Sequence, residues 1–272
     1  MLKLRNAKLT NSVMKNLISL LILLFIWAGS FSQTYTDNTK FAGENYSPRM
    51  NFVKTNVTGI LLKNYSIQYE RVFTKRFSAA ISYRNMPEGG LPFRSMILDR
   101  MDQDDQEGRD IVNNLMVSNF AITPEIRFYL GKKGYGRGFY IAPFARIAGY
   151  EASNFKFNYD DEFGTSQSIS LSGEVNAVTF GVMFGAQWSL GKHLVLDWWI
   201  LGPHAGTGKG DLIGLSTRQL SEFEQNEIRT QLEELDIPMI DKTVTVNSSG
   251  ATMNTDGLWG GLRSGISFGF KF

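Results

Sequence analysis

Cysteine is absent from the 272 residues of the sequence. Disulfide bonds, thiolate catalysis, cysteine-ligated zinc and a lipid-modified cysteine anchor are therefore excluded. Histidine is almost as scarce, with two residues, which leaves little material for acid–base chemistry or metal binding. The sequence accordingly predicts no catalytic residue, no cofactor and no metal site.

A run of apolar residues long enough for a membrane-spanning helix is also missing, since such a helix needs about 20 of them. The apolar run at residues 17–27 is interrupted by Ser19, follows Lys15 and precedes small residues. This order is typical of a signal peptide cleaved before Gln33, and a retained N-terminal anchor is the alternative. The predicted organisation is a signal peptide, a short periplasmic segment and an outer-membrane β-barrel: 1–32, 33–50 and 51–272.

Positive charge is in short supply once the predicted signal peptide is removed. The whole chain has 28 Lys and Arg against 26 Asp and Glu, a formal net charge of +2. The signal peptide holds four of the basic residues and no acid, so the mature chain keeps 24 basic residues against 26 acidic ones. No basic surface remains for nucleic acid, which is not expected as a partner.

The mature chain is rich in segments whose side chains alternate between apolar and small or polar, the period of a β-strand. In one of them, Phe120 and Ile122 share a face, whereas Thr123 and Glu125 lie on the other. Eight such segments predict an all-β fold, an eight-stranded antiparallel up-and-down transmembrane β-barrel. The segments are 52–62, 65–73, 77–84, 117–130, 139–153, 169–190, 194–204 and 258–272.

The connections between these strands alternate in length after the first hairpin. Those after the second, fourth and sixth strands are short, whereas residues 85–116, 154–168 and 205–257 form long connections. Short periplasmic turns and long external loops are typical of outer-membrane barrels, and a soluble sandwich has no reason to sort its loops in this way. The sequence therefore favours a location in the outer membrane, in contact with its lipid and lipopolysaccharide.

Charged residues are predicted on the inner face of the barrel. An eight-stranded barrel is just wide enough for its own side chains to fill, and unpaired charges there would be costly, so we expect a network of ion pairs that plugs the lumen. Glu125 and Arg127 share one strand and one face and are the expected centre. A small solute channel is the alternative. The predicted network is Lys54, Glu70, Arg84, Glu125, Arg127, Arg146, Asp197 and Arg263.

Four stretches of the sequence carry a resemblance to a known family: "TPEIRFYLGKKGYGRGFYIAPFARIAGYE", "NYSIQYERVFTKRFSAAISYR", "GPHAGTGKGDL" and "GFKF". They resemble a family of uncharacterised outer-membrane β-barrel proteins, which implies eight strands and an outer-membrane location but no established activity. The terminal residues Phe270 and Phe272 are similar to the strand signal that the barrel-assembly machinery recognises, which implies that machinery as a partner during biogenesis.

The long connections contain helical signals. In the third, apolar residues follow helical spacing along one broad stripe, and Ser216 with Gln219 can form a capping box. We expect this helix to cover the barrel mouth or another loop, or else to present a surface to a protein partner. A second short amphipathic segment, "LPFRSMILDRM", lies in the connection 85–116. The predicted helix face is Leu220, Phe223, Ile228, Leu232 and Leu235.

Two further interpretations remain open. If His204 faces lipid in phase with Leu196 and lies near Ser264, the pair could hydrolyse a lipid acyl ester. The acidic stretch "DQDDQEG" departs from a calcium-binding loop in its third ligand and its glycine, and a solvated loop is expected there rather than a divalent-ion site. The sequence favours a structural or interaction protein that acts through its external loops 85–116 and 205–257, with a lipid-active enzyme as the alternative.

Overall fold

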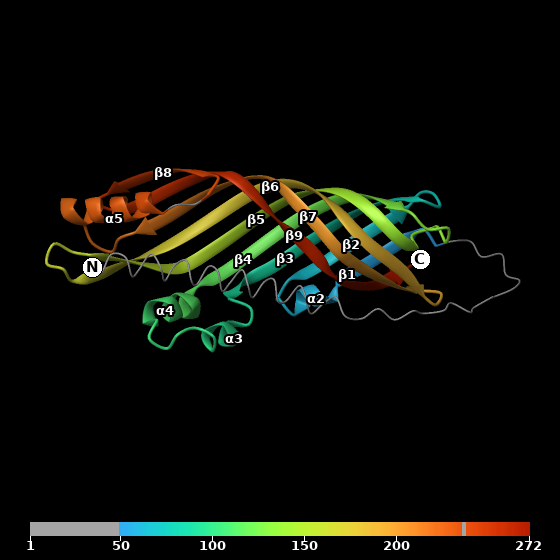
Figure 1. The fold of residues 1–272 in the computed structure, drawn as a ribbon, viewed down its shortest axis with the longest axis horizontal. Helices are drawn as coiled ribbons and strands as arrows, with labels where there is room; N and C mark the ends of the chain where they lie inside the picture. Colours follow the sequence, from blue (N-terminus) through green and yellow to red (C-terminus); the bar gives the residue numbers. More distant parts are fainter. Residues whose placement is uncertain (1–48, 236–237) are drawn as a thin grey trace, which may run out of the picture. The chain divides into compact units, whose positions relative to one another are not determined.

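A computed structural model describes residues 49–235 and 238–272, so the predicted signal peptide and most of the segment 33–50 lie outside it. The described part contains nine strands and four helices (Figure 1). They are β1 (Asn51–Asn56), α2 (Val57–Ile60), β2 (Tyr65–Val72), β3 (Phe77–Gly90), α3 (Arg94–Leu98), α4 (Gln106–Asn114), β4 (Met116–Tyr129), β5 (Gly138–Asp160), β6 (Ser166–Leu190), β7 (Leu194–Leu215), α5 (Glu222–Glu234), β8 (Ile240–Asn247) and β9 (Gly250–Lys271).

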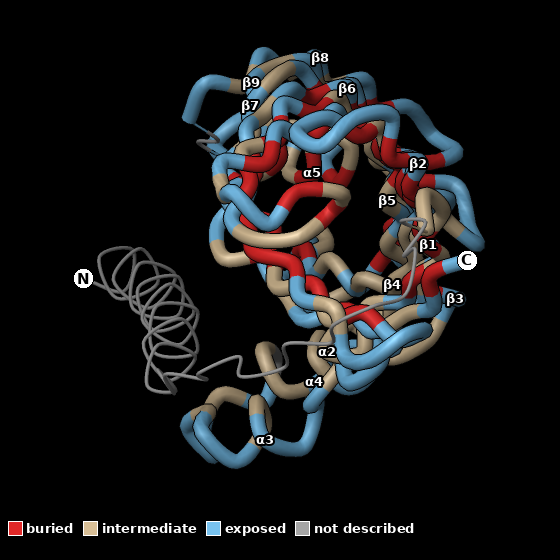
Figure 2. The backbone as a smooth tube through the Cα atoms, turned by 90° about the vertical axis from the view of Figure 1, so that its right-hand side faces the viewer, coloured by how far each residue is buried: buried red, intermediate tan, exposed pale blue. Residues whose placement is uncertain are grey.

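The strands form one sheet that closes on itself. Sequential neighbours pair antiparallel from β1 to β7, β7 then pairs with β9, and β9 pairs with β1. Eight strands therefore complete a ring, and β8 is added beside β9 outside it. Viewed end-on, the strands form a closed ring, and buried residues are distributed around it (Figure 2). The predicted all-β fold with eight ring strands is confirmed.

The strands differ greatly in length, which divides the sheet into two parts. β1 has 6 residues and β2 has 8, whereas β6 has 25. The long strands continue past the ends of β3 and β4 as an open sheet that carries α5 and β8 (Figure 1). We call residues 154–174 and 210–255 the strand extension, and the remainder of the ring strands the barrel section.

The first strand is shorter than predicted. The sequence indicated a strand over 52–62, but β1 ends at Asn56, whose side chain accepts a hydrogen bond from the Gly59 backbone N–H at 2.8 Å. Asparagine is a favoured helix N-cap, so this contact starts the short helix α2 in place of further strand. Consequently β1 covers only a short part of the β9 edge, from Phe52 opposite Lys271 to Asn56 opposite Ser267.

The long connections contain more strand than predicted. Most of 154–168 belongs to β5 and β6, which are joined by a short turn in which Gly164 has a φ of 74°. Most of 205–257 belongs to β7, β8 and β9. The connection 85–116 does hold helical segments, α3 and α4, as expected. Within the described ranges, no helix is long and apolar enough to cross a membrane.

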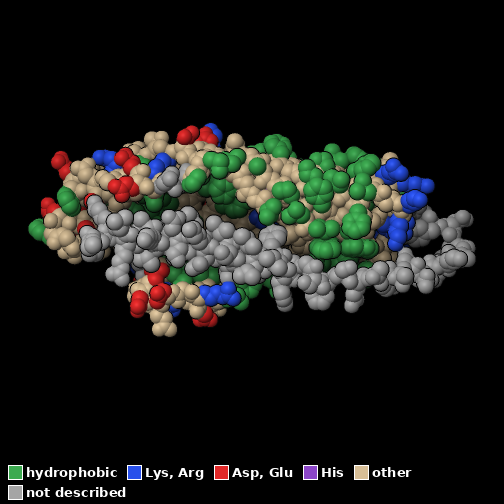
Figure 3. Space-filling model, viewed as in Figure 1, with side chains coloured by type: hydrophobic (Ala, Val, Ile, Leu, Met, Phe, Trp, Pro, Cys, Tyr) green, Lys and Arg blue, Asp and Glu red, His purple; other side chains and the backbone are tan. Residues whose placement is uncertain are grey.

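The outer face of the barrel section is apolar. Phe268 and Phe270 on β9 and the following Phe272 are exposed, whereas Ser267 and Lys271, on the opposite strand phase, are buried. Hydrophobic side chains gather over the barrel section in the space-filling view, and most of the charged side chains drawn there lie to the left or to the right of this apolar area (Figure 3). The barrel section thus reverses the usual arrangement of a soluble protein, with apolar side chains outside and charged ones inside.

Candidate functional site

Arg127 lies at the centre of a buried ionic network inside the barrel section. Its Nη1 atom is 2.7 Å from Asp197 Oδ2 and 3.2 Å from Glu70 Oε2, and its Nε atom donates to Glu125 Oε1 at 2.7 Å. A planar guanidinium can bind several carboxylates at once because its donors point in fixed, divergent directions. One arginine therefore joins three carboxylates from three strands.

Lys54 supplies the second cation of the network. Its Nζ atom is 2.6 Å from both Glu70 Oε2 and Asp197 Oδ2, and it also donates to Gln187 Oε1 at 2.7 Å. These three contacts use all three protons of the ammonium group. None of the charged side chains in these contacts is exposed to solvent.

Neutral side chains complete the network. They donate to oxygens of the three carboxylates, including those that no cation binds, as buried charges require if they are not to be destabilising. Together with the charged residues they come from every strand of the ring. The contacts are Tyr129 Oη to Glu70 at 2.7 Å, Ser78 Oγ to Glu70 at 2.6 Å, Tyr140 Oη to Asp197 at 2.8 Å, Trp199 Nε1 to Asp197 at 3.1 Å, and Gln68 Nε2 to Glu125 at 3.1 Å.

The network is balanced in charge when Arg263 is included. Arg263 Nη1 is 3.4 Å from Glu125 Oε2, and its guanidinium stacks over Phe144 at 4.4 Å and Trp199 at 5.0 Å. Three cations then face three carboxylates. We call Lys54, Arg127, Arg263, Glu70, Glu125 and Asp197 the plug network.

Two residues predicted for this network do not join it. Arg84 donates to Asn119 Oδ1 at 2.9 Å, and Arg146 contacts Thr123 Oγ1 at 3.4 Å. Neither makes an ion pair with a carboxylate among the described residues. Both have the inward strand phase that was predicted. Along their strands, however, they lie nearer to the strand extension than Glu125 does, away from the carboxylates of the network.

Other members of the site were missed although their strand phase pointed to them. Tyr129 lies on the same face of β4 as Arg127, and Gln187 and Trp199 lie on predicted inward faces of β6 and β7. The predicted network contained charged residues alone and therefore left out the polar and aromatic side chains of the same faces. Tyr140 also belongs here, because it has the same strand phase on β5 as Arg146, which was predicted to point inward.

The hypothesis of a Ser264–His204 pair facing lipid is wrong. The β7–β9 pairing shifts register between Trp199 and Gly202, so that His204 has the inward phase, and its ring packs edge-on against Phe144 at 5.9 Å. Ser264 is exposed on the outer face of β9. A β-bulge, which inserts one residue and reverses the phase of all that follow, explains the error.

The predicted helix stripe is partly buried. Leu220, which precedes α5, and Ile228 and Leu232 within it are buried against the concave side of the strand extension, whereas Phe223 and Leu235 are exposed. The helix therefore covers the extended sheet rather than the connection 85–116. The cluster that it joins is Tyr159, Ile169, Leu171, Val246 and Ala251.

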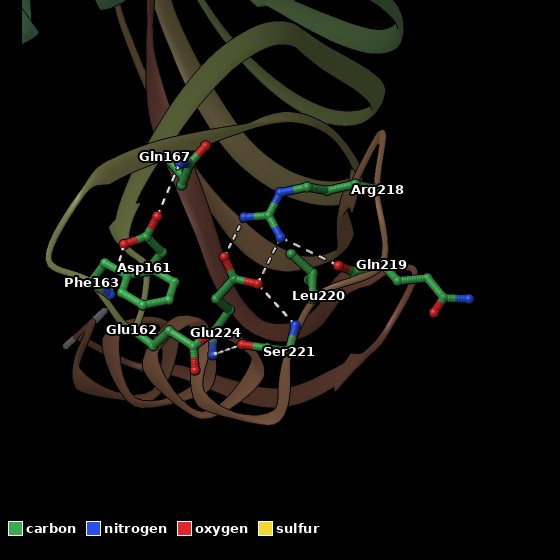
Figure 4. Close-up of a pocket in the computed structure, with 9 residues that line it drawn as sticks. All are labelled: Asp161, Glu162, Phe163, Gln167, Arg218, Gln219, Leu220, Ser221 and Glu224. Carbon is green, nitrogen blue, oxygen red and sulfur yellow. Dashed lines mark hydrogen bonds and ion pairs between the residues drawn. The ribbon is translucent and has the colours of Figure 1, made fainter.

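The N-terminus of α5 lies beside a polar pocket of about 440 Å³ (Figure 4). The capping box is formed by Ser221 and Glu224, not by Ser216 and Gln219 as predicted. Glu224 also pairs with Arg218, and this hydrogen bond lowers the pKa of its carboxyl to about 2. The remaining lining residues are Asp161, Glu162, Phe163, Gln167, Gln219 and Leu220.

The acidic stretch 102–108 has a structural role in the described chain. The Asp105 side chain accepts from the Gly108 backbone N–H at 2.9 Å and caps α4, and Asp102 Oδ1 accepts from the Asp104 backbone N–H at 3.2 Å. No group of three or more metal-ligating side chains is found in the described part. The solvated-loop expectation and the absence of a metal site stay predictions.

These features define a class: an all-β protein whose eight-stranded ring is filled by a buried ionic network. A family model described as a protein of unknown function (DUF3575) matches residues 39–208, more than half of the chain. The chain belongs to this family, which confirms the resemblance to an uncharacterised one. The matched region runs from before β1 into β7, so α5, β8 and the ring-closing β9 follow it. No curated protein matches the chain.

Proposed function

We propose that this chain is an outer-membrane β-barrel with a plugged lumen, whose strand extension acts as an external binding surface. The observation that carries the proposal is a reversal of polarity along single strands. On β6, the outward residues of the extension are polar, such as Ser170 and Ser172, whereas those of the barrel section are apolar, such as Phe180 and Phe184. The inward residues change from the large apolar Ile169 and Leu171 in the extension to a set in the barrel section that includes Thr179 and Gln187.

The reversal has a physical cause only if the two parts of the strand face different solvents. A transmembrane strand presents alternate apolar residues to lipid over about 9–11 residues, and outward residues beyond the membrane face water. The exposed apolar side chains of β6 run from Val178 to Leu190, which is enough for a tilted strand to cross the hydrocarbon. The signal peptide predicted from the sequence supports export to this location.

Heat-modifiability after membrane fractionation tests the location. We expect the protein in the outer-membrane fraction, with a different apparent mass in SDS before and after boiling, because a closed barrel resists SDS until heated. A protein that is soluble in the periplasm and shows no shift would contradict the proposal.

The extension is the part of the chain that we expect to contact a protein partner. Phe163 is 85% exposed at the β5–β6 turn, and Phe223 is 50% exposed at the start of α5. Loops and extensions held by a rigid scaffold commonly carry binding residues. A photo-crosslinking residue at Phe163 or Phe223 should capture a partner in intact cells, whereas one at Ser170, on the polar outer face of β6, should not. Equal capture at all three positions would contradict a specific surface.

The two alternative functions have less support. Conduction requires a path past the plug network and its neutral hydrogen-bond partners, which together come from all eight ring strands. Ser264 and His204 have opposite strand phases, so they cannot act together on a lipid ester.

A further inference from the structure

Between the plug network and the strand extension, the barrel interior holds a second group of basic side chains. Arg84 comes from β3, Arg146 from β5, Arg263 from β9 and His204 from β7. His204 interacts electrostatically with all three arginines, and Arg146 interacts with both Arg84 and Arg263. We call these four residues the arginine cluster.

The arginine cluster has too few carboxylates for its charge. Arg263 shares Glu125 with Arg127, so that this acid already belongs to the balanced plug network. Arg84 and Arg146 are left with neutral hydrogen-bond partners among the described residues, Asn119 for Arg84 and Thr123 for Arg146, and both arginines interact electrostatically with Tyr150. The plug network neutralises its cations, and the arginine cluster does not.

Buried polar atoms of this region also lack partners. Arg146 is 4% exposed and Thr179 is 2% exposed, yet Arg146 Nε and Thr179 Oγ1 make no hydrogen bond within the described chain. The same holds for Arg84 Nε and His204 Nδ1. Unsatisfied buried donors are costly, and native proteins keep few of them unless they serve a function. The polar atoms without a hydrogen-bond partner in this region therefore come from β3, β5, β6 and β7.

Strand pairing is interrupted beside the cluster. β1 stops at Asn56, so residues 259–265 of β9 pair with β7 alone among the described residues. β3 likewise pairs only with β4 beyond Asn85. Arg263 and Arg84 belong to β9 and β3, the two strands that each lose one pairing partner here. The short helix α2 lies next to β9 at the end of this gap in strand pairing, where the Ile266 backbone N–H donates to Thr58 Oγ1.

From these observations we propose that the arginine cluster is a binding site for a phosphate or carboxylate group. Guanidinium groups bind such oxyanions in a bidentate manner, and Thr179 and Tyr150 provide hydroxyl donors beside them. The group can belong to a small soluble anion or to the head of an anionic amphiphile that enters through the gap in strand pairing. The second source rests on the proposed membrane location, whereas the site itself does not.

The test uses the full chain refolded in uncharged maltoside micelles. Calorimetric titration with inorganic phosphate and with citrate measures binding of soluble anions, and native mass spectrometry with phosphatidic acid, against phosphatidylethanolamine, measures binding of amphiphiles. We expect at least one probe to bind. Arg84→Gln and Arg146→Gln should each weaken its binding about tenfold or more, since each removes a charge-assisted contact. Thr179→Val, a small change of shape, should weaken it several-fold.

Lys209→Gln is the matched control, because Lys209 has a 78% exposed side chain paired with Asp256. It should leave binding unchanged. Each variant is first checked for the heat-induced shift, so that only closed barrels are compared. The proposal is overturned if no probe binds the closed wild-type barrel, or if the cluster variants and the control bind alike. Binding of phosphate by a protein found outside the outer membrane would keep the site and reject the location.

Discussion

The barrel section and the strand extension are built from the same strands but have opposite polarity. In the extension, α5 and the sheet enclose Ile228, Leu232 and Leu171 as a soluble protein would. In the barrel section, the enclosed residues include Arg127 and Asp197, and the apolar ones face outward. One chain thus encloses an apolar cluster in the extension and an ionic network in the barrel section, and the polarity of the two strand faces reverses between them.

The difference teaches that the apolar face of a strand identifies its surroundings, not its core. A strand records only that its two faces differ, and the same alternation suits a sandwich or a membrane barrel. Which face of the strand points inward is shown by the side chains that the closed sheet encloses. A buried network with three cations and three carboxylates can exist only because the ring closes and places all partners within hydrogen-bond distance.

The largest expected effect comes from removing the central cation of the plug network. Arg127→Met leaves Glu125 with Arg263, at 3.4 Å, as its remaining cation, and it removes one of the two ion pairs of Glu70 and one of the two of Asp197. We expect a cost of about 3–5 kcal/mol in the free energy of unfolding. Urea unfolding in micelles, followed by tryptophan fluorescence, measures it. Arg100→Met, at an exposed position, is the control and should cost almost nothing. Equal stability of the two variants would show that the network contributes little.

A charge placed on the outer face of β6 should distinguish the two parts directly. Phe180→Arg lies in the barrel section and should destabilise the membrane-inserted protein by about 2–4 kcal/mol if lipid surrounds it. Ser172→Arg lies on the same outer face in the extension and should change stability by less than about 0.5 kcal/mol. Unfolding from lipid vesicles measures both. Similar effects at the two positions would remove the reason to place a membrane boundary between them.

The interior of the extension should respond as an apolar core. Ile228→Val deletes one methylene from a side chain that is fully buried, and we expect a loss of about 1 kcal/mol. Ile213→Val, exposed on the outer face of β7, is the matched control with a smaller loss. Thermal unfolding of the two variants measures the difference. A loss at Ile213 as large as that at Ile228 would mean that the outer face of the extension is also covered.

Much of the barrel could be predicted from the sequence because alternation is a local property. The inward phase of Glu125, Arg127 and Asp197 follows from their neighbours along the strand, and closure of the ring then brings them together. What could not be predicted depends on contacts between strands. The bulge that turns His204 inward is set by pairing with β9, and the separation of Arg84 and Arg146 from the carboxylates is set by the stagger of the strands.

The strand extension was predicted least well, and for a related reason. Apart from residues 169–174, which lie in the predicted strand 169–190, its strand segments fall in predicted loops, because their apolar residues are fewer and their outer faces are polar. The helix stripe was recognised, but its cap was placed at Ser216 instead of Ser221, since both serines precede a residue able to complete a capping box. The choice between them is made by Arg218, which pairs with Glu224 across the turn.

The smallest effect that we predict is a pH dependence confined to the extension. The hydrogen bond from Arg218, aided by the Ser221 N–H, holds the pKa of Glu224 at about 2, below its ordinary value of 4.5. A depressed carboxyl pKa stabilises the folded state fully above the ordinary value, and this contribution is lost as the pH falls through the folded pKa. The difference in melting temperature between the wild type and Glu224→Gln should therefore be constant above about pH 5 and shrink toward pH 2. Glu222→Gln, exposed in the same helical turn, is the control, and a constant difference for Glu224→Gln down to pH 2 would show that the Arg218 contact does not stabilise the extension.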